Sequence, residues 1–118
     1  EPFIEKSSKG DTPILVSDDG KMRLAIIGWL KTVEWLQWYD VQAEPGGKLD
    51  SDPHQRGSIE NLSVIKGTFE VEVGGVTETA SAGESLRYRC DRQHIIRYVG
   101  DEPGHAMMVV ILKAAVME

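Results

Sequence analysis

Turn-forming residues recur at short, regular intervals along this chain of 118 residues. Clusters of glycine, proline and aspartate favour tight turns, and they stand roughly eight to twelve positions apart, a spacing typical of an antiparallel sandwich or barrel. The segments between the turns are of strand length. We predict strands at Pro13 to Ser17, Met22 to Ile27, Val33 to Val41, Ile59 to Ile65, Thr68 to Val73, Val76 to Ala80, Ser85 to Tyr88, His94 to Val99, and Ala106 to Leu112.

The alternation of apolar and charged residues supports strands rather than helices. It is clearest where Phe69, Val71 and Val73 alternate with two glutamates, which predicts a strand with one buried and one wet face. The segment Trp29 to Tyr39 also fits a helical spacing, but its aromatic content favours a strand. The fold class expected from these patterns is all-β, with one antiparallel domain.

Length and charge narrow the function classes. A chain of 118 residues accommodates a single domain, predicted over residues 1–118 with a polar lead-in at 1–12. The net charge of −6 opposes contact with nucleic-acid phosphates. No apolar run reaches the roughly 20 residues of a membrane-spanning helix. The single cysteine, Cys90, and the absence of a signal peptide predict a cytoplasmic protein.

Two histidines and one glutamate stand where a barrel would bring them together. His54 lies in a loop, and Glu60 follows six residues later at the start of a strand, on the same face as the apolar Leu62 and Val64. Glu60 should therefore point inward, where a carboxylate is costly unless it is paired or bound to a cation. His94 begins another strand. Imidazole and carboxylate ligands together suit zinc, iron(II), manganese or nickel.

Spacing alone leaves a second interpretation open. His54 could be a solvated loop residue, and His94 a hydrogen-bonded residue of the barrel wall. His/Glu spacings of this length also arise by chance.

The two segments that hold these residues resemble the two motifs of the cupin family. His54, Glu60 and Gly67 have the spacing of the first motif, and Gly83 and His94 have the spacing of the second. The resemblance covers about residues 33 to 112. It implies a small antiparallel jelly-roll barrel, with His54, Glu60 and His94 as the ligands of a divalent metal, zinc first and iron, manganese or nickel as alternatives.

The chain resembles one class of cupins more closely, the sensor domains that follow a helix-turn-helix domain in bacterial transcriptional regulators. The similarity includes regulators of sulfur and amino-acid use, and it lies in the patterns His54-x-x-Gly57-x-x-Glu60, Val64-x-x-Gly67, Ala82-Gly83-Glu84 and Asp91-x-x-His94. It implies a domain that senses a small metabolite, contacts DNA only through an N-terminal domain missing from this chain, and forms a homodimer. The edge strands within Pro13 to Ile27 are the expected dimer surface.

Departures from the family pattern bear on the ligand set. Arg56 stands where many cupins have a second histidine, and Tyr98 stands where the second motif ends in asparagine. A fourth metal position is thus open to water, to a ligand or to Asp52. We predict that Arg56 and Tyr98 contact an anionic or zwitterionic effector, an amino acid or a sulfur-containing relative. The alternative function is a small metal-dependent cupin enzyme, an iron(II) dioxygenase or an isomerase.

Overall fold

The computed structural model describes residues 3–8, 10, 12–28 and 35–112. Within them the chain forms ten strands and no helix. The strands are β1 (Ile14–Val16), β2 (Met22–Ile26), β3 (Leu36–Ala43), β4 (Lys48–Ser51), β5 (Ile59–Lys66), β6 (Thr68–Val73), β7 (Val76–Ser81), β8 (Ser85–Arg89), β9 (His94–Tyr98) and β10 (Gly104–Ile111).

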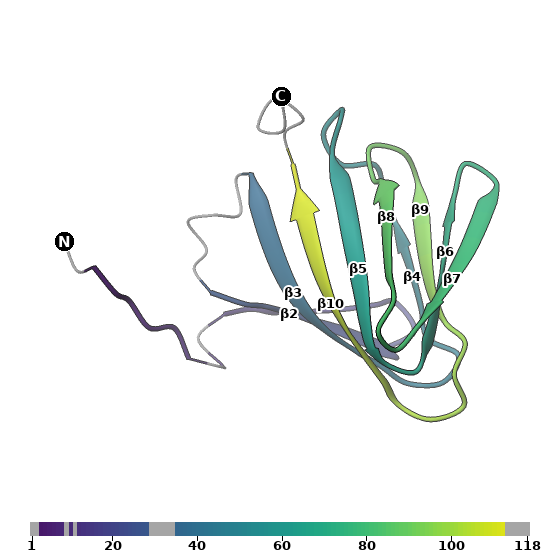
Figure 1. Ribbon diagram of the computed structural model, residues 1–118, viewed down its shortest axis with the longest axis horizontal. Coiled ribbons are helices and arrows are strands. Elements are labelled where there is room, and N and C mark those ends of the chain that lie inside the picture. The colour runs from purple at the N-terminus through teal and green to yellow at the C-terminus, as the bar shows by residue number, and fades with distance from the viewer. Residues whose placement is uncertain (1–2, 9, 11, 29–34, 113–118) are drawn as a thin grey trace.

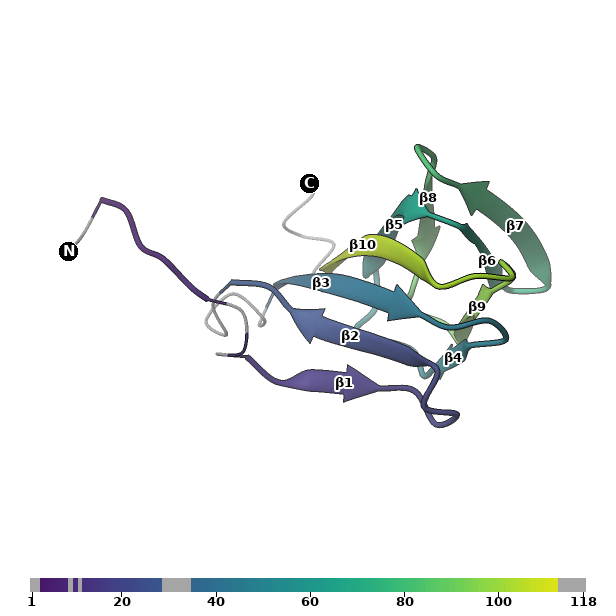
Figure 2. The ribbon, with the colours of Figure 1, turned by 90° about the horizontal axis from the view of Figure 1, so that it is seen from below.

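The strands form two antiparallel sheets that make a small jelly-roll barrel (Figures 1 and 2). The larger sheet has the order β1-β2-β3-β10-β5-β8, and the smaller sheet has the order β4-β9-β6-β7. Neighbours such as β3 and β10 are far apart in sequence, as the Greek-key connections of a jelly roll require. The all-β class and the jelly-roll architecture predicted from the sequence are confirmed.

Alternation along the strands places the core between the sheets. On β5, Glu60, Leu62 and Val64 are buried, whereas Asn61 and Ser63 are half-buried. Opposite them, the smaller sheet contributes buried apolar side chains such as Phe69 and Ile96. Because alternate residues of a strand point to the same side of its sheet, these buried side chains of the two sheets face each other and largely fill the barrel interior.

One strand of the structure was not predicted, and one predicted strand is described only in part. β4 was not predicted, because Lys48–Ser51 contains a single apolar residue; it forms through pairing with β9, in which Ser51 lies opposite His94. The preference for a strand over a helix is confirmed from Leu36 onward, whereas residues 29–34 lie outside the described part of the chain. Within the described residues, no helix is long and apolar enough to cross a membrane.

Candidate metal centre

Glu60 is a carboxylate in the barrel interior. It lies on β5, which pairs with β10 and with the edge strand β8 of the larger sheet, opposite Val110 of β10 on one side and Tyr88 of β8 on the other. Only 2% of its surface is exposed, so the inward orientation predicted from alternation is confirmed. A buried carboxylate needs partners or a cation to offset its lost hydration.

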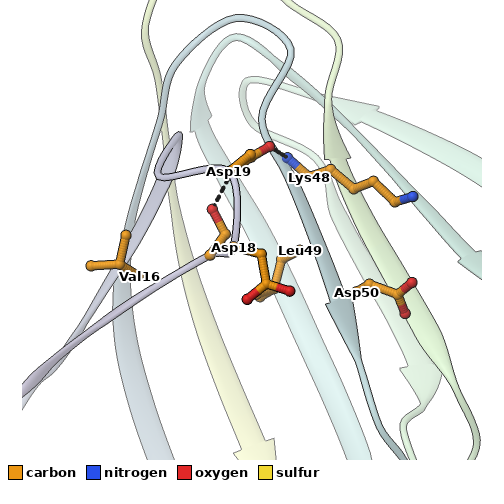
Figure 3. Close-up of a pocket in the computed structure, with 7 residues that line it drawn as sticks. Val16, Asp18, Asp19, Lys48, Leu49 and Asp50 are labelled. Carbon is orange, nitrogen blue, oxygen red and sulfur yellow. Dashed lines mark hydrogen bonds between the residues drawn. The ribbon is translucent and has the colours of Figure 1, made fainter.

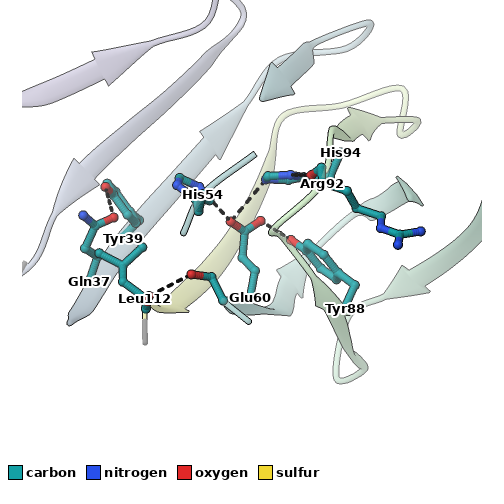
Figure 4. A network of polar contacts seen from close by, with 9 residues as sticks. Gln37, Tyr39, His54, Glu60, Tyr88, Arg92, His94 and Leu112 are labelled. Atoms are coloured by element: carbon teal, nitrogen blue, oxygen red, sulfur yellow. Dashed lines mark hydrogen bonds and ion pairs between the residues drawn. The ribbon is translucent and has the colours of Figure 1, made fainter. Parts of the chain in front are cut away.

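Two imidazoles approach the same oxygen of this carboxylate (Figure 4). His94, at the start of β9, is buried, and its Nε2 lies 3.5 Å from Oε2 of Glu60. His54, in the loop after β4, has a side chain that is 35% exposed, and its Nε2 lies 3.9 Å from the same oxygen. The structure therefore brings together the three residues that the sequence singled out.

The orientation of His94 is fixed by a backbone carbonyl. Its Nδ1 lies 2.9 Å from the carbonyl oxygen of Arg92, so Nδ1 donates a proton to that oxygen. The lone pair of the imidazole is then on Nε2, which faces Glu60. A histidine that binds a metal through one nitrogen commonly donates its other N–H in this way.

The distances between these groups fit a shared metal ion. Zinc bonds of about 2.0 to 2.3 Å place neighbouring donor atoms of a tetrahedral site roughly 3.5 Å apart. The two nitrogen-to-oxygen distances of 3.5 and 3.9 Å are close to that separation and long for strong hydrogen bonds. The donor chemistry of two imidazoles and one carboxylate therefore fits a divalent ion.

The structure adds two residues that the sequence analysis did not include in the site. The hydroxyl of Tyr88 donates a hydrogen bond to Oε1 of Glu60, which leaves Oε2 for the imidazoles (Figure 4). The sulfur of the buried Cys90 forms a compact group with His54 and Glu60, because their ligand-type atoms all lie within 4.8 Å of one another. Alternation along its strand, which points Tyr88 inward, was the sequence signal that could have placed Tyr88 in the site. Cys90 follows the predicted strand, so the predicted strand pattern gave no such signal for it.

Burial and the Glu60 charge together set the protonation of the site. Burial lowers the pKa of His54, against the opposing effect of Glu60. Burial acts in the same direction on His94, but contacts with Glu60 and the Arg92 carbonyl outweigh it and raise the pKa of His94. Burial and Glu60 also raise the pKa of Tyr88 well above its usual value and that of Cys90 to about 12. The same carboxylate thus accompanies opposite pKa shifts in the two imidazoles, lowered in His54 and raised in His94.

A cavity of about 120 Å³ adjoins the two groups His54 and Glu60. Its wall is mainly apolar, with the amide of Gln37 and the hydroxyl of Tyr39 as polar groups; this hydroxyl donates to Oε1 of Gln37 at 2.7 Å. A mostly apolar lining with a few polar groups is typical of a ligand site. The lining residues are Leu15, Leu24, Gln37, Tyr39, Leu49, Ser51, His54, Glu60, Met108 and Val110.

The structure does not bring Arg56 and Tyr98 to this cavity. Arg56 is exposed on the loop that carries His54, and Asp52, the candidate fourth ligand, is exposed as well. Tyr98 lies at the far end of β9 from His94, where it is 3% exposed and its hydroxyl donates to the carbonyl of Glu102. Tyr98 shares a strand face with His94, but this does not bring the two side chains to the same site, because four residues along a strand span roughly 13 Å.

Glycines surround the ring of Tyr98 at this end of the barrel. A Cβ atom on Gly67, which has φ of +87°, would lie 2.2 Å from the Tyr98 hydroxyl oxygen, and one on Gly104 would lie 2.2 Å from its ring. Phe69 packs against the same ring, with 4.9 Å between the ring centroids. In the structure Tyr98 closes the barrel end by packing.

A second hollow, of about 280 Å³, lies on the surface between the β1–β2 turn and β4 (Figure 3). Asp19, one of the three aspartates that line it, accepts hydrogen bonds from the Ser17 hydroxyl and from the backbone N–H groups of Lys21 and Lys48. These bonds join the turn to β4, so Asp19 is part of the scaffold beside the cavity wall.

Known proteins similar to this chain include a regulator and proteins of the same fold. The HTH-type transcriptional regulator SutR of Escherichia coli strain K12 is 34% identical over 70 residues, which are 59% of this chain and 39% of SutR. This chain thus spans well under half the length of that relative. A cupin domain of an XRE family transcriptional regulator from Enterobacter cloacae is 22% identical with a TM-score of 0.72, over 79% of this chain and 98% of that one.

A predicted oxalate decarboxylase from Thermotoga maritima has the same fold at 16% identity, with a TM-score of 0.72 over 93% of this chain and 99% of that one. At such identities the likeness to solved structures describes the fold alone. The cupin domain family matches residues 39–110, which include the predicted ligands on β5 and β9 and in the loop between β4 and β5. The chain belongs to the cupin domain family.

Proposed function

We propose that this chain is the effector-binding domain of a helix-turn-helix transcriptional regulator, with one divalent metal ion at His54, Glu60 and His94. The observation that carries the regulator assignment is the 34% identity with SutR over 70 residues. Zinc is the first candidate, and iron, manganese and nickel are the alternatives, because imidazole and carboxylate donors accept all four. The ion would supply the positive charge that the buried carboxylate of Glu60 requires.

The effector of this proposal is a compact metabolite that occupies the cavity of about 120 Å³ beside the metal ligands. Leu24, Leu49 and Met108 would pack against an aliphatic or thioether side chain, and Gln37 would bond a polar group. Arg56 does not line the cavity, but it is exposed two residues after His54, and it would bind in a two-point contact a carboxylate that projects from the cavity toward this loop. An amino acid or a sulfur-containing relative has this chemistry. Tyr98 has no part in it, since its hydroxyl is bonded elsewhere.

Signalling would depend on a dimer and on a DNA-binding domain outside this chain. The edge strand β1 exposes Ile14, Leu15 and Val16 by 47 to 52%, an apolar edge suited to a second copy. A ligand shifts such a dimer only by binding one arrangement more tightly than the other. Because the net charge of −6 repels phosphates, the isolated domain should give no gel shift with DNA. A cytoplasmic location follows from this role.

The test is a thermal-shift screen of amino acids and their sulfur analogues on the metal-loaded protein. A ligand at 100 times its dissociation constant adds about 2.7 kcal/mol of stability. At roughly 4 °C per kcal/mol for a chain of this length, the melting temperature should rise by about 10 °C. The Arg56→Ala variant should respond less to carboxylate ligands. If no compound stabilises the wild type, the effector assignment fails; if carboxylates act equally on both proteins, Arg56 is not the carboxylate site.

A metal-dependent enzyme is the second candidate function, favoured by a donor set of three residues that leaves positions open on the ion. The two candidates differ in the fate of the ligand. Each stabilising compound is incubated with the iron(II)-loaded protein in air and analysed by mass spectrometry for oxidised products and by NMR for isomers of unchanged mass. The regulator proposal expects unchanged compound, and turnover would support an oxygenase or isomerase instead.

A further inference from the structure

We propose that the thiolate of Cys90 is the fourth protein ligand of the metal ion. This inference rests on the proposed metal site at His54, Glu60 and His94 and completes its donor set. The ligand-type atoms of Cys90, His54 and Glu60 lie within 4.8 Å of one another, and the Nε2 atom of His94 lies 3.5 Å from Glu60 on the same carboxylate oxygen as His54. The carboxylate of Glu60 thus has three potential donor groups near it, two imidazoles and one thiol.

The backbone of Cys90 is bonded to both chain segments that carry ligands of the first motif. Its N–H donates to the carbonyl of Ser58 at 3.1 Å, two residues before Glu60. Its carbonyl accepts the N–H of His54 at 2.8 Å. The next residue adds a side-chain hydrogen bond to the loop that carries His54, since a carboxylate oxygen of Asp91 accepts the N–H of Gly57 at 2.8 Å. The position of the thiol relative to His54 and Glu60 is therefore fixed by the fold.

The burial of Cys90 agrees with an internal role for its sulfur. The residue has 0% exposure, and it follows the last residue of β8 at the point where the chain turns toward His94. Its side chain is therefore inside the barrel, beside the loop of His54, and out of contact with solvent. A sulfur at this place faces the ligand cluster rather than a partner protein.

A sulfur donor changes what the site does with its ion. Two imidazoles, one carboxylate and one thiolate complete the tetrahedral coordination of zinc, which is the arrangement of structural rather than catalytic zinc sites. Thiolate also favours zinc over harder ions such as manganese. The ion would join the loop after β4 to the start of β9 and support one cavity wall, and the effector would bind beside it without displacing a ligand.

Cobalt(II) substitution tests this ligand directly. The wild-type protein is loaded with cobalt(II), and its absorption spectrum is recorded next to those of Cys90→Ser and of Met107→Leu, a sulfur-removing control on the outer face of β10. A thiolate ligand gives an intense sulfur-to-cobalt charge-transfer band in the near ultraviolet. We expect this band in the wild type and in Met107→Leu and its loss in Cys90→Ser. Zinc affinity, measured by chelator competition, should fall at least about tenfold in Cys90→Ser.

The outcomes separate this inference from the metal site itself. Visible cobalt bands without the charge-transfer band in the wild type would overturn Cys90 as a ligand while the metal site stands. Cobalt that does not bind the wild type at all would overturn the metal site and the inference with it. The wild-type spectrum decides even if Cys90→Ser does not fold, because the chain has a single cysteine.

Discussion

Replacing Tyr88 with phenylalanine removes the hydroxyl that donates to the buried Oε1 atom of Glu60. A hydrogen bond to a charged group contributes about 1.5 to 3 kcal/mol, and the carboxylate, at 2% exposure, has no access to bulk water that would replace it. At roughly 4 °C per kcal/mol for this chain length, the metal-free variant should melt about 6 to 12 °C below the wild type. Zinc affinity should fall by about 10- to 100-fold, because Tyr88 orients a proposed ligand.

Tyr39→Phe is the matched control. Its hydroxyl donates to the neutral amide oxygen of Gln37, a bond worth about 0.5 to 1.5 kcal/mol, and makes no hydrogen bond to Glu60. Differential scanning calorimetry of both variants without metal, and zinc titration of both, gives the comparison. If Tyr88→Phe is no less stable than Tyr39→Phe and binds zinc as the wild type does, the hydroxyl of Tyr88 does not support the carboxylate.

Three further predictions follow from the fold. Gly67→Ala should destabilise the protein in urea by about 2 kcal/mol or more, since its Cβ would strike Tyr98, whereas Gly75→Ala, with φ of +80° and open space, should cost about 1 kcal/mol. Contacts with Arg89 and the Gly57 N–H lower the pKa of Asp91 to about 2. The contribution of the Asp91 carboxylate to the stability of the fold should therefore be complete above the unfolded pKa of about 3.9 and be lost as the pH falls through about 2. The stabilities of the wild type and Asp91→Asn, measured by urea unfolding across this range, should converge at the acid end. Val16→Lys should convert the proposed dimer to a monomer in light scattering, and an unchanged mass would exclude the β1 edge as the interface.

The fold was largely predictable because strand alternation and turn residues are local signals. Phe69 and Val71 alternate with glutamates in the sequence and are buried in the structure. β4 was missed because its strand character comes from its partner β9, and pairing of distant segments leaves no pattern in Lys48–Ser51 itself.

The site was predictable only where spacing and strand face determine it. Glu60 and His94 are inward positions of strands, and the loop of His54 lies beside both. Predicting that Tyr88 contacts Glu60 would have required the register of β5 and β8, which sets the two residues opposite each other. Predicting the place of Cys90 would have required the backbone hydrogen bonds that join it to Ser58 and His54. Contacts of this kind depend on tertiary pairing, and no residue spacing encodes them.

The zinc content of the purified protein decides whether the buried cluster is a metal centre. Native mass spectrometry of the wild type after zinc addition and dialysis should show about one zinc per chain. His94→Ala removes a buried ligand whose Nε2 lies 3.5 Å from Glu60, and it should lower zinc affinity by about one to two orders of magnitude. Circular dichroism checks that the variant is folded. Equal zinc content and affinity in the wild type and in folded His94→Ala would contradict a metal centre at these residues.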